Sequence, residues 1–248
     1  MFIPNTQDIL YKVWLYRLLV EIADDMDLAR QLCFKGGTCA AMLGYINRFS
    51  VDLDFDFLGR RDDIPLMRKK IETHAQELDL EIKDYSKTGI QYFFRYDAPK
   101  EKRNTIKLDV AFPVPKQNTY ASAYFADIDR TMRHQTVETM FANKLVSVID
   151  RYEKYKSVAG RDLYDIHQFF LQGFSYRPEI IEERRGVKMQ TFIKQLIDFI
   201  KKHITETVIT QDINMLLTRK EFQKIRKILI SETVSLLENC LDKSTEEV

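Results

Sequence analysis

The sequence predicts an α+β protein in which a first half of strands and helices precedes a helical second half. In the first half, short runs alternate apolar and polar residues or are mostly apolar, as strands are. These runs cover residues 31–34, 49–57, 80–84, 90–96 and 105–112. In the second half, apolar residues recur at helical spacing instead. The helices expected there cover residues 137–152, 162–171, 187–203, 209–217 and 221–241.

Three helices are expected among the strands of the first half. The first covers residues 7–24, and its apolar stripe consists of Leu10, Val13, Trp14, Leu18 and Ile22. The second covers residues 39–45, with Gly37 or Thr38 placed to cap its N-terminus. The third covers residues 62–78 and begins with two acids and a proline, which suit a helix start.

A domain boundary is expected in the stretch 113–133, which we interpret as a connection between the two halves. The first domain is accordingly residues 1–125 and the second, helical domain residues 126–248. Within the second domain, residues 182–230 contain eleven basic and six acidic side chains, so the basic charge of the chain is concentrated there.

Composition excludes several classes of protein. With 45% hydrophobic and 30% charged residues, the chain is typical of a folded globular protein. No apolar run approaches the length of a membrane span, and charged residues interrupt the apolar N-terminal segment, so we expect neither a membrane anchor nor an export signal. Three cysteines without a C-x-x-C spacing favour a reducing, cytoplasmic location and no zinc site. The four histidines lack the spacing of metal ligands, and we expect each to be an ordinary surface or partly buried side chain.

The strand at residues 49–57 carries an acid at every second position. Because side chains alternate across a strand, Asp52, Asp54 and Asp56 share one face, with like charges only about 7 Å apart. Strands disfavour Asp, so a merely solvated acidic face is the weaker interpretation. Carboxylate oxygens are the ligands of hard cations, and the pattern predicts a site for one or two Mg²⁺ ions.

A third carboxylate on a neighbouring strand would complete such a site. Asp109 is the preferred candidate, because it has apolar neighbours on both sides in a strand-like run. Asp97 is a rival for the same place. Two metals held by such carboxylates can activate an attacking hydroxyl and neutralise a triphosphate and its leaving pyrophosphate.

A Gly-Gly pair stands between the first strand and the following short helix. Gly36 and Gly37 have no side chains, so backbone amides at this turn could approach a phosphate closely, and Thr38 could add its hydroxyl. An ordinary turn is the commoner explanation of such a pair. The acidic strand that follows favours the phosphate site.

These motifs resemble those of a known family. The run Lys35-Gly36-Gly37-Thr38, the later run from Arg48 to Phe55, and Lys144 followed by Arg161-Asp162-Leu163-Tyr164-Asp165 together resemble the AbiEii/AbiGii toxin family. That family lies within the DNA polymerase β-like nucleotidyltransferase superfamily, and the motifs span residues 35–166. The Gly-Thr pair departs from the Gly-Ser that is more usual in the superfamily.

The resemblance implies a fold and a reaction. The first domain would be a polymerase-β-like core, a small mixed sheet flanked by helices, and the helical domain would close one side of the active-site cleft. The reaction would be Mg²⁺- or Mn²⁺-dependent transfer of a nucleoside monophosphate from an NTP to an acceptor, with release of pyrophosphate.

The resemblance also implies roles for particular residues. Asp52, Asp54 and Asp109 would bind metal, and Lys144 and Asp162 would join them as catalytic residues. The nucleotide would be bound by Lys35, Gly36, Gly37, Thr38, Arg48, Ser50 and Lys144. A surface role for Arg48 and Ser50 is an equal alternative, and a contribution of Asp56 or Asp165 stays open.

The implied function is that of a toxin controlled by a cognate antitoxin. The acceptor would be RNA, such as tRNA, in agreement with the basic second half. Two alternatives remain: a nucleotidyltransferase that modifies a small molecule such as an antibiotic, and a catalytically silent module that binds a nucleotide or a partner.

Overall fold

The computed structural model describes residues 8–99 and 102–246, with side chains to residue 241, and they form two compact units. Unit 1 comprises the described residues up to Gly44 together with Arg48–Val114 and Thr119–Thr136. Unit 2 comprises Tyr45–Asn47, Pro115–Asn118 and the described residues from Val137 onward. Each unit has a buried apolar core of its own.

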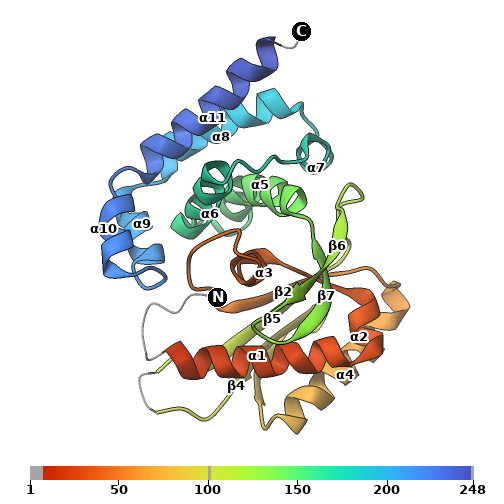
Figure 1. The fold of residues 1–248 in the computed structure, drawn as a ribbon. Helices are drawn as coiled ribbons and strands as arrows, with labels where there is room; N and C mark the ends of the chain where they lie inside the picture. Colours follow the sequence, from red (N-terminus) through yellow and green to blue (C-terminus); the bar gives the residue numbers. More distant parts are fainter. Residues whose placement is uncertain (1–7, 100–101, 247–248) are drawn as a thin grey trace. The chain divides into compact units, whose positions relative to one another are not determined.

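Unit 1 is built on a seven-stranded mixed sheet with the strand order β3-β4-β5-β2-β1-β7-β6 (Figure 1). The strands are β1 (Leu32–Lys35), β2 (Asp52–Phe57), β3 (Glu81–Tyr85), β4 (Ile90–Arg95), β5 (Thr105–Ala111), β6 (Tyr120–Phe125) and β7 (Arg130–Gln135). The helical segments are α1 (Ile9–Asp24), α2 (Met26–Gln31), α3 (Gly36–Met42), η2 (Arg61–Asp63) and α4 (Ile64–Glu77). Helix α1 contacts β5 and β7, α4 contacts β3 and β4, and the two helices contact each other.

Strand β2 lies in the middle of the sheet, parallel to β5 and antiparallel to β1. Its apolar residues Leu53 and Phe55 are fully buried, and burial of this kind is the main favourable term in folding. The hydroxyl of Tyr11 on α1 donates to the backbone oxygens of Val51 and Thr105, just before β2 and at the first residue of β5. Helix α1 is therefore tied to the two strands that carry the predicted metal ligands.

The predicted strands of the first half are confirmed as β1 to β5, with ends shifted by up to three residues. The prediction that residues 113–133 form a connection was wrong, because this stretch contains β6 and most of β7. Strand β6 is an edge strand with mostly exposed or half-exposed side chains, so no apolar alternation marks it. A boundary at residue 125 falls between the paired strands β6 and β7, and residues 119–136 belong to unit 1.

Helix α1 buries a different stripe from the expected one. Leu18 and Ile22 are buried as predicted, but Leu10 and Val13 are 38% and 39% exposed. The buried face is instead Tyr11, Leu15, Leu18, Leu19 and Ile22. Tyr11 displaces the expected residues because its hydroxyl reaches two backbone acceptors inside the unit. Gln7, the predicted first residue, lies outside the described residues.

Helix α3 begins three residues earlier than predicted, and the predicted cap was wrong. Gly36, Gly37 and Thr38 form its first turn, and Lys35 is the N-cap residue. Thr38 is fully buried and donates its hydroxyl to the Asp52 carbonyl oxygen at 2.5 Å. That bond connects α3 to the start of β2, so the hydroxyl serves tertiary structure instead of a cap.

Unit 2 is helical, as predicted, and no sheet strand is found in its described part. Its helices are α5 (Val137–Tyr155), α6 (Gly160–Leu171), α7 (Pro178–Arg185), α8 (Met189–His203), α9 (Glu206–Ile213), α10 (Arg219–Ile225) and α11 (Leu229–Glu246). Helix α7 was not predicted, and the helix expected over 221–241 is divided into α10 and α11. In the part of the chain that is described, no helix has the length and apolar character needed to cross a membrane.

Asp56 links four strands of unit 1 through one buried carboxylate. It is 0% exposed, and its Oδ1 accepts an ion-paired hydrogen bond of 2.6 Å from Lys35 Nζ on β1. Its Oδ2 accepts from Tyr120 Oη on β6 at 2.9 Å and from Gln135 Nε2 on β7 at 2.6 Å. A buried charge is tolerated when it is paired and hydrogen-bonded in this way.

We expect Asp56→Ala to reduce the free energy of unfolding by about 3–5 kcal/mol, because it leaves Lys35, Tyr120 and Gln135 without their shared acceptor. Urea unfolding followed by circular dichroism measures the change. Asp97→Ala, at an exposed aspartate after β4, is the matched control and should change stability by less than about 0.5 kcal/mol. Equal effects of the two substitutions would contradict the structural role of Asp56.

Candidate active site

The parallel pairing of β2 with β5 brings the predicted metal ligands together. In this register Asp54 lies opposite Asp109, and Asp52 lies opposite Lys107. Residues at paired positions point to the same face of a sheet, and so do residues two apart on one strand. Asp52, Asp54 and Asp109 therefore share one face, as the sequence predicts.

The Asp54 carboxylate is the least compensated charge of the three. Among the described residues, no side chain or backbone group makes a hydrogen bond or ion pair with it. Burial and the neighbouring charge of Asp52 raise the pKa of Asp54 from 3.8 to about 6, against the opposing charges of Lys35 and Lys107. A carboxylate in this condition gains from any cation that approaches it.

Asp109 is held by two donors from its own neighbourhood. Its Oδ2 accepts from Lys107 Nζ at 2.6 Å and from Gln91 Nε2 on β4 at 2.9 Å. Lys107 is half-buried, and although burial lowers its pKa, the hydrogen bond and charge of Asp109 raise it overall. Asp97, the rival third acid, lies beyond the end of β4 and outside the register that joins β2 to β5.

Lys107 and Gln91 are residues of this site that the sequence analysis did not identify. Lys107 could have been found, because it is two residues before Asp109 on the same predicted strand and so shares its face. Gln91 could not have been found in that way, because its place opposite Asp109 depends on the antiparallel register of β4 with β5.

Asp56 is the third acid of the alternating pattern on β2, but its carboxylate has partners that the Asp54 carboxylate lacks among the described residues. Its carboxylate is fully buried and occupied by Lys35, Tyr120 and Gln135. Asp54 is partly exposed. Asp56 is therefore occupied by donors of the protein itself, and the assignment of Asp52 and Asp54 as metal ligands stays a prediction.

The glycine turn lies directly against the acidic strand. Gly36 has a φ of +76°, which favours glycine, and a Cβ atom there would stand 2.4 Å from Asp54 Oδ2. A Cβ atom on Gly37 would stand 2.5 Å from Arg48 Nη2 and 2.8 Å from Ser50 Oγ. Both glycines are thus required by close contacts within unit 1.

The other residues expected to bind nucleotide have intramolecular partners. Lys35 is paired with Asp56, and Thr38 is bonded to the Asp52 carbonyl. Arg48 is 3% exposed and donates from Nη1 to the Phe49 carbonyl oxygen at 2.9 Å, while Ser50 is 6% exposed. The alternative that Arg48 and Ser50 lie on the surface was wrong, since both side chains are buried.

The later motif forms a buried ion cluster inside unit 2. Lys144 Nζ lies 3.0 Å from Asp162 Oδ1 and 3.1 Å from Asp165 Oδ2, and Arg151 Nε lies 3.0 Å from Asp162 Oδ2. Burial alone would raise the pKa of Asp162, but the charges of Lys144, Arg151 and Arg161 outweigh it and lower the pKa to about 2. Asp162 is therefore an anion at neutral pH, and Lys144 is positioned by two aspartates.

The donor set of unit 1 fits a divalent cation. Three carboxylates share one face of a parallel strand pair, and the central one, Asp54, has a raised pKa and no hydrogen-bond donor among the described residues. Oxygen ligands of this kind suit Mg²⁺ or Mn²⁺. Carboxylates on adjacent strands beside a Gly-Gly turn define the class: the arrangement is that of a nucleotidyltransferase.

Comparison with known proteins agrees with this class. The family model for the nucleotidyl transferase AbiEii toxin of type IV toxin–antitoxin systems matches residues 17–233. The chain belongs to this family, and the family resemblance predicted from its motifs is confirmed. It is a nucleotidyltransferase. No curated protein matches the chain in a sequence comparison.

Solved structures share the fold. A Helicobacter pylori protein assigned as a nucleotidyltransferase is 22% identical, with a TM-score of 0.59, and the match covers 96% of this chain and 98% of that one. The nucleotidyltransferase toxin MenT4 from Mycobacterium tuberculosis is 15% identical, with a TM-score of 0.51 and coverage of 94% and 84%. An antigenic nucleotidyltransferase-like protein from Paracoccidioides brasiliensis is 16% identical, with a TM-score of 0.50 and coverage of 80% and 93%.

We expect Asp54→Asn to raise the melting temperature of the metal-free protein at pH 7. A carboxyl with a pKa near 6 when folded and near 3.8 when unfolded makes the fold lose stability as the pH rises from about 4 to 6, and the loss persists at pH 7. Removing the charge removes that loss, and each kcal/mol regained raises the melting temperature by about 2–4 °C.

Calorimetry in a chelator at pH 7 and at pH 4.5 measures this effect, and the gain should be smaller at pH 4.5. Asp56→Asn is the matched control, because it removes the negative charge that pairs with Lys35 on the same strand and should lower the melting temperature at pH 7. A lower melting temperature for Asp54→Asn at pH 7 would contradict the uncompensated charge at this position.

Proposed function

We propose that this protein is a Mg²⁺- or Mn²⁺-dependent toxin that transfers a nucleoside monophosphate from an NTP to RNA, such as tRNA, and that a cognate antitoxin controls it. The observation that carries the proposal is the pairing of Asp54 with Asp109 across parallel strands, with Asp52 on the same face. Family membership supports the toxin class and the NTP.

Asp52, Asp54 and Asp109 are the residues proposed to hold the metal. When bound there, a divalent ion would lower the pKa of the acceptor hydroxyl and neutralise triphosphate charge. Gln91 and Lys107 orient the Asp109 carboxylate. Gly36 and Gly37 keep the turn beside Asp54 free of side chains, so that the triphosphate can approach the backbone.

Lys144 and Asp162 are proposed to act in the same reaction, as the family motif implies. Asp162 and Asp165 position the Lys144 ammonium group, whose positive charge can neutralise phosphate charge as it develops. Arg151 pairs with the other oxygen of Asp162, at 3.0 Å from its Nε. If substitution of Lys144 or Asp162 left transfer unchanged, the proposed role of the acidic strand would still stand.

Exposed cations in unit 2 support an RNA acceptor. Several basic side chains of 182–230 are in ion pairs, including Arg184 with Asp150 and Arg185 with Glu153. Arg226 pairs with Glu206. Four basic side chains beside it, on and just after α10, are exposed and, within the described residues, make no ion pair: Arg219, Lys220, Lys224 and Lys227. Cations of this kind can neutralise an RNA backbone without reading its sequence.

We expect Asp54→Ala to abolish both transfer and growth arrest, since it removes the carboxylate nearest Asp109 in the register. Incubation with α-³²P-labelled NTPs and either total tRNA or a panel of small hydroxylated acceptors measures transfer and locates the label. Asp97→Ala is the matched control and should keep both activities. Asp97 is exposed and lies beyond the end of β4, outside the register that joins β2 to β5.

Unchanged toxicity of Asp54→Ala would reject the metal site. Label on a small acceptor alone would reject the RNA substrate in favour of antibiotic-type transfer. No labelling of any acceptor by the wild-type protein would favour a silent binding module.

We expect the double variant Lys220→Ser/Lys224→Ser to weaken RNA binding while the KM for NTP stays constant, because both ammonium groups are exposed on α10. Each lost phosphate contact should reduce the slope of log affinity against log salt by about 1. Lys83→Ser/Lys87→Ser, a pair at and just after strand β3, removes the same charge and is the control. Equal loss of affinity in both variants would contradict a binding surface on α10.

A further inference from the structure

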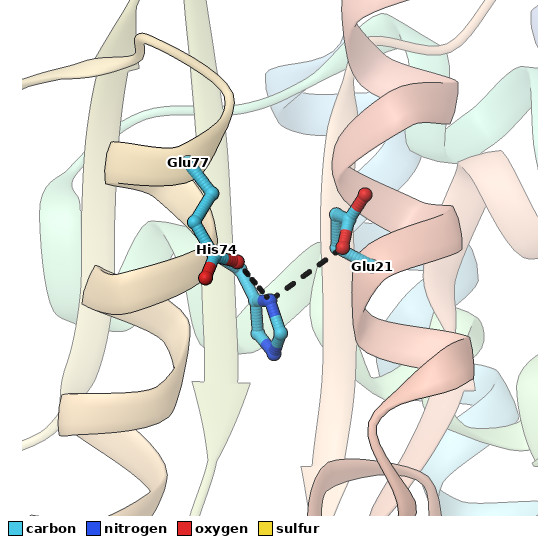
Figure 2. Close-up of side chains that lie close together, drawn as sticks. All are labelled: Glu21, His74 and Glu77. Atoms are coloured by element: carbon cyan, nitrogen blue, oxygen red, sulfur yellow. Dashed lines mark hydrogen bonds and ion pairs between the residues drawn. The ribbon is translucent and has the colours of Figure 1, made fainter.

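Helices α1 and α4 of unit 1 bring together three side chains that no part of the proposed reaction uses. Glu21 comes from α1, while His74 and Glu77 come from α4, one helical turn apart (Figure 2). One ligand atom from each residue lies within 4.8 Å of the others. His74 is 17% exposed by its side chain, so the imidazole is mostly enclosed, whereas Glu77 is 60% exposed.

The two glutamates approach the same nitrogen of the histidine. His74 Nδ1 lies 3.2 Å from Glu77 Oε2 and 3.6 Å from Glu21 Oε2. The longer separation exceeds that of an ordinary hydrogen bond. Two ligand atoms at about 2.0–2.2 Å from a tetrahedral zinc ion stand about 3.3–3.6 Å apart. The two distances from Nδ1 are close to this range, and the ligand atoms of the two glutamates lie within 4.8 Å of each other.

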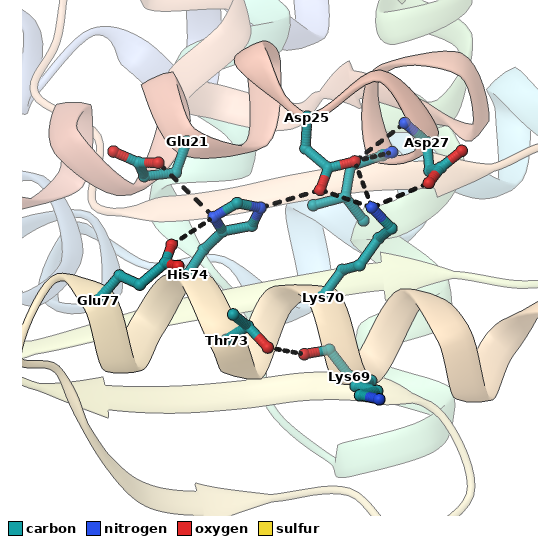
Figure 3. Close-up of polar contacts among 9 residues, drawn as sticks. Glu21, Asp25, Asp27, Lys69, Lys70, Thr73, His74 and Glu77 are labelled. Carbon is teal, nitrogen blue, oxygen red and sulfur yellow. Dashed lines mark hydrogen bonds and ion pairs between the residues drawn. The ribbon is translucent and has the colours of Figure 1, made fainter.

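The hydrogen bond made by the other ring nitrogen, Nε2, determines whether Nδ1 of a neutral ring carries a lone pair. His74 Nε2 lies 3.0 Å from Asp25 Oδ2 (Figure 3). Asp25 also accepts from Lys70 Nζ and from the backbone N–H groups of Asp27 and Leu28, where it caps α2.

Asp25 is a hydrogen-bond acceptor for Lys70 and for two backbone N–H groups, and in the same role it accepts from Nε2–H of His74. A neutral ring with its proton on Nε2 has its lone pair on Nδ1. That lone pair then faces two carboxylates, which are also acceptors. Either a proton or a metal ion on Nδ1 would turn this contact between acceptors into a favourable one. A carboxylate that orients a histidine through its second nitrogen is the usual outer partner of a metal-binding histidine.

Few of the described basic groups lie close enough to neutralise the two glutamates. Lys70 pairs with Asp25 and Asp27, at 2.9 Å and 2.8 Å. Among the residues whose side chains are described, His74 is the one basic group that pairs with Glu21 or Glu77. A single proton on the ring would neutralise one of these two glutamates, whereas a divalent ion would neutralise both.

We propose that Glu21, His74 and Glu77 form a binding site for a divalent transition-metal ion, with zinc as the best fit, and that the ion joins α1 to α4. An imidazole nitrogen with two carboxylate oxygens suits zinc and leaves a fourth position for water. Magnesium is disfavoured, because it prefers oxygen ligands throughout. The site is separate from the acidic strand and does not depend on the transfer reaction.

Zinc titration of the full chain tests the proposal. The acidic strand could also take zinc, so the titration uses the Asp52→Asn/Asp54→Asn background. We expect one equivalent of zinc to bind in this background and to raise the melting temperature. His74→Gln should abolish both effects, and Glu77→Gln, at an exposed position, should weaken binding at least tenfold without unfolding the protein.

Glu81→Gln is the matched control, since Glu81 is an exposed acid that pairs only with Arg95 among the described side chains, and it should bind zinc as the background does. ¹⁵N NMR of the ring distinguishes the metal from a proton, with His74→Gln assigning the signals. The proposal expects a protonated Nε2 and a metal-bound Nδ1. Two protonated nitrogens in the presence of excess zinc, or equal zinc binding by His74→Gln, would overturn the site.

Discussion

The parallel pairing of β2 with β5 is the constraint on which the rest of unit 1 depends. It places Asp54 opposite Asp109 and keeps Asp52 on the same face, although like charges at such spacing repel one another. Hydrophobic burial of Leu53 and Phe55 on the other face holds the strand in place against that repulsion. Tyr11 adds hydrogen bonds at the beginning of both strands. The sheet therefore keeps an unfavourable arrangement of charge available for a cation.

The three acids of β2 illustrate how neighbours divide roles along one alternating pattern. Asp56 is neutralised by Lys35 and bonded by Tyr120 and Gln135, so it stabilises the sheet. Asp54 has no such donor among the described residues, and its pKa rises. Asp56 thus stabilises the sheet, while Asp54, two positions earlier, keeps a charge that a cation could neutralise. The Lys144 and Asp162 pair in unit 2 shows the compensated case again, with a lowered pKa at the aspartate.

Errors in the predicted fold have a common origin in contacts between distant segments. Strand β6 was missed because an edge strand is stabilised by backbone pairing with β7 and not by an apolar face. The α1 stripe was misplaced because Tyr11 finds acceptors on two strands. Thr38 was expected at a helix cap, but it bonds to the Asp52 carbonyl.

The sequence by itself determined the α+β class, the strands β1 to β5, the helical second half and the family, since these depend on local periodicity and on motifs within short segments. It also predicted Asp52, Asp54 and Asp109 as a set of metal ligands, and this stays a prediction. Only the tertiary structure decided that Asp109 faces Asp54, that Gln91 and Lys107 hold it, and that Asp56 is occupied by partners. The reason is physical: strand register and ion pairing join residues far apart in the chain, and local patterns carry no information about which of them meet.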